Sequence, residues 1–71
     1  MSENIENIQG ITTKNDYFYI SQEDFLYKVS STGTIIEKTT AKTNGGIDFS
    51  QGLLYCLNDE GRKEYIYTYK I

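Results

Sequence analysis

Short apolar segments alternate with polar turns along the whole chain, and no window shows the 3.6-residue period of an amphipathic helix. The turns are rich in Gly, Asn, Asp and Ser, which tight turns favour. The dipeptide Asn44-Gly45 fits either a type I′ hairpin turn or a longer connection. The pattern predicts a meander of short β-strands at residues 8–13, 17–21, 25–30, 34–38, 47–49, 53–57 and 65–71.

The second half of the chain resembles the first half at a fixed distance. Gly10, Ile11 and Tyr19 recur 36 positions later as Gly46, Ile47 and Tyr55. The segment Leu-Tyr-Lys-Val at 26–29 resembles Thr-Tyr-Lys-Ile at 68–71, a distance of 42. This difference predicts about six additional residues in the second copy, in a loop at 58–63. We interpret the pattern as an internal duplication, with chance similarity between strands as the alternative.

A four-stranded unit of this length resembles a blade of the β-propeller superfamily. Residues 10–36, GITTKNDYFYISQEDFLYKVSSTGTII, follow the cadence of such blades: Gly-Ile, an aromatic strand, a Leu-Tyr-Lys-Val strand and a final Gly-x-Ile-Ile strand. The resemblance implies an all-β fold with one blade at about residues 9–43 and a second at about 44–71. The second blade has only three predicted strands, so residues 2–8 are expected to complete it, in the same chain or in a neighbouring one.

Two blades cannot close a ring of the usual four to eight, so the resemblance implies self-assembly. The segments YFYI and LLYCL are apolar at successive positions, which is typical of strands covered on both faces. We expect a homotrimer that forms a six-bladed propeller, similar in architecture to the small two-blade lectins of bacteria and fungi, with a tetramer of eight blades or a dimer of four as the alternatives. The pockets of those lectins use Trp and Arg, whereas this chain has no Trp and a single Arg, Arg62. The alternative fold is a small monomeric SH3-like barrel with only five of these strands.

Composition narrows the classes of partner. The chain has 71 residues and a net charge of -3, which fits one small domain and argues against binding to a nucleic-acid backbone. The polar start MSENIENIQG is not a signal peptide, and no apolar run has the length of a membrane span. We therefore expect a cytoplasmic protein with no membrane partner.

Catalytic and metal chemistry have little support in the sequence. The chain has no His, and its single Cys, Cys56, lies within the apolar segment LLYCL, where a buried thiol is expected. A lone Cys provides neither an internal disulfide nor a zinc site. No nucleotide or cofactor motif is present. We expect a protein that is not an enzyme and needs no cofactor or metal.

Five residues are the candidates for ligand binding. Asp48 lies on the predicted innermost strand of the second blade, where a ring would place it at the channel, although it could instead bond a neighbouring backbone amide. Asn44 and Arg62 lie in predicted loops, and an Arg side chain binds carboxylates and phosphates well. Tyr17 and Tyr65 do not recur between the two halves, so we assign them to a contact surface.

These features predict an oligomeric propeller that binds or sequesters a small ligand, such as a sugar, a metabolite or a nucleotide signal. The alternative is a small acidic inhibitor or adaptor that binds a partner protein, by analogy with phage counter-defence proteins. A ligand-binding protein should have one pocket at each junction between blades, whereas an inhibitor should have one broad patch.

Overall fold

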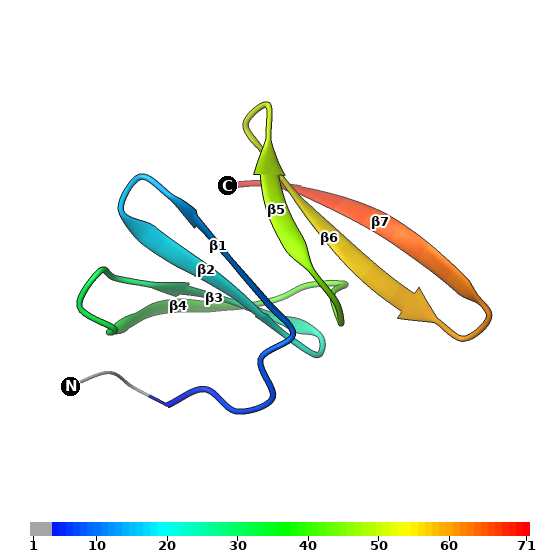
Figure 1. Ribbon diagram of the computed structural model, residues 1–71, viewed down its shortest axis with the longest axis horizontal. Helices are drawn as coiled ribbons and strands as arrows, with labels where there is room; N and C mark the ends of the chain where they lie inside the picture. The colour runs from blue at the N-terminus through cyan, green and yellow to red at the C-terminus, as the bar shows by residue number, and fades with distance from the viewer. Residues whose placement is uncertain (1–3) are drawn as a thin grey trace.

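The computed structural model describes residues 4–71, which form seven strands in two antiparallel sheets and contain no helix (Figure 1). Sheet 1 contains β1 (Gly10–Lys14), β2 (Tyr17–Gln22), β3 (Phe25–Val29) and β4 (Ile35–Thr40), and sheet 2 contains β5 (Ile47–Ser50), β6 (Leu53–Glu60) and β7 (Lys63–Lys70). The expected all-β fold is confirmed. The alternative five-stranded barrel does not form, because the strands divide into two separate sheets. No helix in the described part of the chain could span a membrane.

Two-residue turns set the register of the hairpins. Asn15 and Asp16 both have positive φ angles, as do Gln51 and Gly52 at the equivalent place in sheet 2. A positive φ at both central residues is characteristic of the type I′ turn, whose twist matches that of antiparallel strands. Asn44-Gly45 does not form such a turn, because it belongs to the longer connection between β4 and β5.

The first two strands of each sheet pair in the same register, 36 residues apart. Ile11 pairs with Ile20 in sheet 1, and Ile47 pairs with Cys56 in sheet 2. The third strands of the two sheets, β3 and β7, match at a different distance. This distance follows from the residues with which they pair on β2 and β6. Tyr19 pairs with Lys28, whereas Tyr55 pairs with Thr68. Residues of β3 therefore match residues of β7 that lie 40 positions later.

The predicted distance of 42 and the long loop at 58–63 are therefore wrong. The second copy has four additional residues, and they extend the strands β6 and β7 as far as the pair Glu60–Lys63. Only Gly61 and Arg62 remain in the turn, and Gly61 supplies the positive φ angle. Hydrogen bonds from Tyr67 Oη and Asn58 Nδ2 to Glu60 Oε2, both 2.7 Å, stabilise the extended hairpin.

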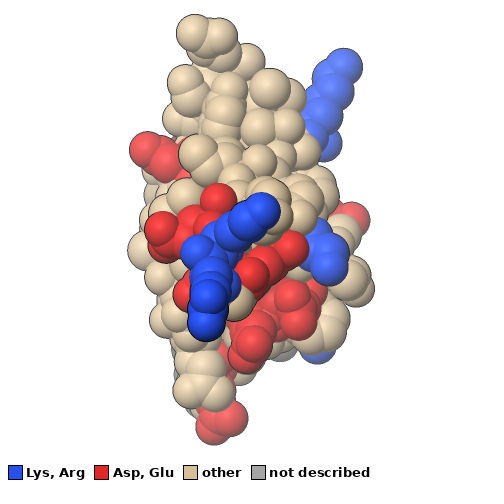
Figure 2. Space-filling model, turned by 90° about the vertical axis from the view of Figure 1, so that its right-hand side faces the viewer, with Lys and Arg blue, Asp and Glu red and all other residues tan. Residues whose placement is uncertain are grey.

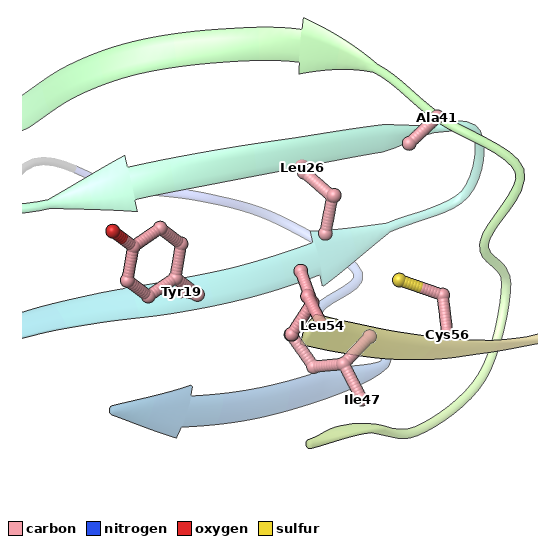
Figure 3. Packing of buried hydrophobic residues seen from close by; sticks show 6 residues of the cluster. All are labelled: Tyr19, Leu26, Ala41, Ile47, Leu54 and Cys56. Carbon is pink, nitrogen blue, oxygen red and sulfur yellow. The ribbon is translucent and has the colours of Figure 1, made fainter. Parts of the chain in front are cut away.

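The core lies between the two sheets (Figure 3). Figure 3 shows its six side chains gathered between strands of both sheets: Tyr19, Leu26, Ala41, Ile47, Leu54 and Cys56. Leu54 and Cys56 have no exposed surface. The strands β1 and β5 also lie in contact, so the first strand of one sheet is the neighbour of the first strand of the other.

Each sheet keeps an apolar outer face, which we define as the face turned away from this core. The outer face of sheet 1 includes Ile11 and Phe18, and the outer face of sheet 2 includes Tyr55, Leu57 and Ile66. Successive residues of one strand point to opposite faces, so a strand that is apolar on both faces does not alternate. This accounts for the sequences YFYI and LLYCL.

The segment before β1 lies against sheet 1. Residues 4–9 form no strand, and Ile5 packs against Ile20, Tyr27 and Val29. Gln22 Nε2 donates a hydrogen bond of 2.6 Å to the carbonyl oxygen of Glu6. Residues 2 and 3 lie outside the described residues, and completion of the second blade by residues 2–8 stays a prediction. In residues 4–71, β6 is the sole strand paired with β7.

Candidate functional site

A groove of about 390 Å³ opens between the two sheets, next to the core. Its walls come from β2, β3 and β4 on one side and from the end of β7 on the other. Its lining includes Tyr19, Leu26, Lys28, Glu37, Tyr69 and Lys70. The groove therefore joins an apolar floor to charged side chains.

The aromatic walls of the groove are held in place by contacts behind them. Tyr19 packs edge to face with Phe49, with ring centroids 5.0 Å apart. The hydroxyl of Tyr69 accepts a hydrogen bond of 2.6 Å from the backbone nitrogen of Lys42. This bond joins the end of β7 to the connection that follows β4. Both rings are thus positioned before any ligand arrives, which lowers the entropic cost of binding.

Charged groups in the groove belong to strands rather than to loops. Lys28 and Glu37 are opposite one another in the pairing of β3 with β4. Lys28 Nζ lies 4.3 Å from the centre of the Tyr17 ring, a cation–π contact. Lys70 comes from the last position of β7, on the other side of the groove. Lys28, Lys70 and Glu37 thus line a groove with an apolar floor, a combination that suits a small molecule with a flat ring and a charged group.

The structure does not bring the five predicted binding residues together. Tyr17 is half-buried against the core and below Lys28, and Asp48 is exposed on β5. Arg62 is exposed in the turn between β6 and β7, and Tyr65 is exposed on β7 beside Tyr67. Of the five, Tyr17 contacts a residue that lines the groove.

Two of the five candidates make contacts that organise the fold. Asn44 Oδ1 accepts a hydrogen bond of 2.7 Å from Asp59 N, and Asn44 Nδ2 donates one of 2.8 Å to Asp59 O. Asn44 therefore joins the connection between the sheets to β6. Asp48 Oδ1 accepts hydrogen bonds from the backbone nitrogen of Phe49 at 2.9 Å and from Thr12 Oγ1 at 3.0 Å.

Sequence reasoning missed Lys28, Tyr69 and Lys70 as site residues. The signal was present, because the pair Tyr-Lys occurs at 27–28 and again at 69–70. The sequence pattern alone gave these tyrosines and lysines no binding role. Only the approach of β7 to sheet 1 places Lys28 and Lys70 in the same groove.

Cys56 is a poor nucleophile in this environment. Burial raises the pKa of the Cys56 thiol, and the neighbouring Thr43 side chain has a smaller opposite effect on that pKa. The thiolate, which is the reactive form, is therefore disfavoured near neutral pH.

Charge on the side of the β6–β7 hairpin is mixed. Figure 2 views this side of the molecule and shows acidic and basic side chains interspersed, with a large area that carries no charge. An interspersed pattern is typical of a solvated surface and produces no strong field of one sign.

Comparison with known proteins gives no match: no protein-family model, no curated protein and no solved structure is similar to this chain.

Proposed function

We propose that this chain is a non-enzymatic binding protein that holds a small anionic ligand in the groove between its two sheets. The observation that carries the proposal is the groove itself, where Tyr19 and Tyr69 flank an apolar floor and the lining includes Lys28 and Lys70 as well as Glu37. Nucleotides and phosphorylated or carboxylated sugars and metabolites combine a ring with an anionic group, so they are the ligand classes that fit.

The proposed assembly is a six-bladed propeller made of three chains, in which each sheet is a blade. Three features support this architecture. The first two strands of the sheets share one register, their hairpins have the same turn type, and the first strands β1 and β5 are neighbours. In a propeller, equivalent first strands of successive blades lie side by side around the central channel. A trimer would present the groove three times, which raises the avidity for a multivalent ligand.

The proposal is tested by isothermal titration calorimetry with two matched pairs of probes: adenosine monophosphate with adenosine, and glucose 6-phosphate with glucose. We expect at least one phosphorylated probe to bind, and its unphosphorylated partner to bind more weakly. Lys28→Ala and Lys70→Ala should each weaken that binding by about ten- to a hundredfold, since one charge-assisted hydrogen bond contributes about 1.5–3 kcal/mol. Lys63→Ala, at an exposed position of β7 outside the groove, serves as the control.

Binding that is unchanged in both lysine variants would contradict the assignment of the groove. Absence of heat with all four probes at millimolar concentration would contradict the small-ligand proposal. Capture of a partner protein by a chain that binds none of the probes would favour the alternative, an inhibitor or adaptor.

A further inference from the structure

The outer face of sheet 2 is apolar and exposed, and so is the part of the outer face of sheet 1 at Ile11 and Phe18, beside the area around Ile20 that Ile5 packs against. Ile11 is 56% exposed on sheet 1, and Ile66 is 65% exposed on sheet 2. We infer that the outer face of sheet 2 docks onto the outer face of sheet 1 of the next copy of this chain, head to tail. This inference rests on the ring assembly proposed above and identifies the surfaces that form it.

The interface between the two sheets of one chain is the template for this contact. Sheet 1 contributes Tyr19 and Leu26 to that interface, and both are 6% exposed. Their counterparts in sheet 2, by strand pairing, are Tyr55 at a distance of 36 and Ile66 at a distance of 40. Both counterparts are large and apolar, and both lie exposed on the outer face of sheet 2.

The same relationship holds in the opposite direction. Sheet 2 contributes Ile47 and Leu54 to the interface within the chain, where they are 9% and 0% exposed. Their counterparts in sheet 1, 36 residues earlier, are Ile11 and Phe18, which are exposed on its outer face. The exposed outer faces therefore carry the same kinds of side chain that the chain already buries against one another. A contact of this type joins two different surfaces, so it propagates from copy to copy and forms a ring when the rotation between successive copies closes.

Glycine at one matched position gives independent support. A Cβ atom on Gly10 would lie 3.1 Å from backbone atoms of Gly45, Gly46 and Ile47, so a side chain there would require this backbone to shift. The counterpart of Gly10 is Gly46, where a Cβ atom would meet only Leu57 Cδ1, at 4.0 Å. Nothing within residues 4–71 requires glycine at position 46. Docking of the next copy would require it, because residues 9–11 of that copy would approach Gly46 as residues 45–47 approach Gly10.

The two surfaces are also hollowed. The outer face of sheet 1 carries a groove of about 280 Å³, lined in part by Ile11 and Phe18. The outer face of sheet 2 carries one of about 310 Å³, lined in part by Tyr55, Leu57 and Ile66. Projecting side chains beside hollows on each surface allow interdigitation, which is how packed interfaces reach the density of protein interiors.

The test is native mass spectrometry of the full chain and of three variants. The wild type is expected as a closed oligomer of three chains of 8.2 kDa. Gly46→Ala should weaken association by about tenfold or more through a clash of its new methyl group. Ile66→Thr should weaken association as well, because it removes apolar surface while keeping a β-branched side chain. Ile36→Thr alters a similarly exposed isoleucine of β4 outside both grooves, so it should keep the mass of the wild type.

Circular dichroism of each variant shows whether the chain is folded, so that loss of association can be distinguished from unfolding. Gly46 has no positive φ angle and has room for a methyl group, so a folded single chain should accept Gly46→Ala. Folded, dissociated Gly46→Ala and Ile66→Thr proteins would support the inference. Oligomers that persist in both variants would overturn the choice of faces and leave the ring assembly intact. A monomeric wild type would overturn the ring and the inference together, while the calorimetric test of the groove would still apply to the single chain.

Discussion

The hydroxyl of Thr12 donates a hydrogen bond of 3.0 Å to the carboxylate of Asp48, and the two residues occupy the same place in their sheets. Thr12 pairs with Tyr19 in sheet 1, and Asp48 pairs with Tyr55 in sheet 2. Each residue of the second pair lies 36 positions after its counterpart in the first pair. A direct bond between matched positions means that the first strands of the two sheets are neighbours. In a closed ring, each Asp48 would also face Thr12 of the next copy.

Asp48→Ala should destabilise the folded chain modestly. The substitution removes the acceptor for Thr12 Oγ1 and for the backbone nitrogen of Phe49, and an exposed position limits the cost to about 0.5–1.5 kcal/mol. Urea denaturation measures this change in the free energy of unfolding. Asp48→Asn keeps an oxygen at the same place and should cost less, so equal losses in both variants would show that the negative charge matters more than these two bonds.

Gly10→Ala should destabilise the chain by about 1–3 kcal/mol, the usual cost of an additional methyl group at a close-packed contact. The methyl group would lie 3.1 Å from three backbone atoms, which cannot rotate away as a flexible side chain can. A thermal melt followed by circular dichroism measures the effect. An unchanged melting temperature would mean that sheet 2 does not approach β1 this closely.

Leu54→Ala should cost about 2–5 kcal/mol, because it opens a cavity in a fully buried part of the core. This is a large share of the 5–15 kcal/mol typical of whole proteins, so the variant should be close to unfolding at room temperature. Urea denaturation provides the measurement. Leu57→Ala is the matched control, since Leu57 is 48% exposed on the adjacent outer face and should cost far less in a single chain.

The free energy of unfolding should decrease at acidic pH, in part because the Glu60 carboxylate becomes protonated. Hydrogen bonds from Tyr67 Oη and then from Asn58 Nδ2 lower the pKa of the Glu60 carboxyl below its ordinary value of 4.5. The folded state therefore favours the ionised carboxylate, and its contribution to stability is complete above about pH 4.5 and is lost as the pH falls through the lowered pKa.

The measurement is the melting temperature of wild type and Glu60→Gln as the pH is lowered from neutral into this acidic range. The wild type should lose more than the variant, because glutamine has no proton to gain. Glu64→Gln, on the facing strand, should follow the wild-type curve. Parallel curves for wild type and Glu60→Gln would be inconsistent with a role for these two hydrogen bonds.

Local pattern was enough to find the strands but not their ends. Every predicted strand corresponds to one of β1 to β7, because alternation, aromatic content and turn residues are properties of a few adjacent positions. The region 58–63 was predicted as a loop from its polar and charged residues. Pairing of Asn58 with Tyr65 and the bonds to Glu60 extend the hairpin there, and these contacts join residues on two strands.

The sequence by itself determined that this protein is all-β, that the segments YFYI and LLYCL are apolar at successive positions, and that the first two strands of each half match at a distance of 36. Only the tertiary structure decided which faces are buried and where a ligand could bind. Tyr19 and Tyr55 are the same residue at matched positions, yet one is buried and the other exposed. Lys28 and Lys70 line one groove only because the C-terminal end of β7 lies next to sheet 1. Which side chains are buried, and which come together in one groove, depends on contacts between residues far apart in the chain. A local sequence pattern carries no information about which sheet lies opposite.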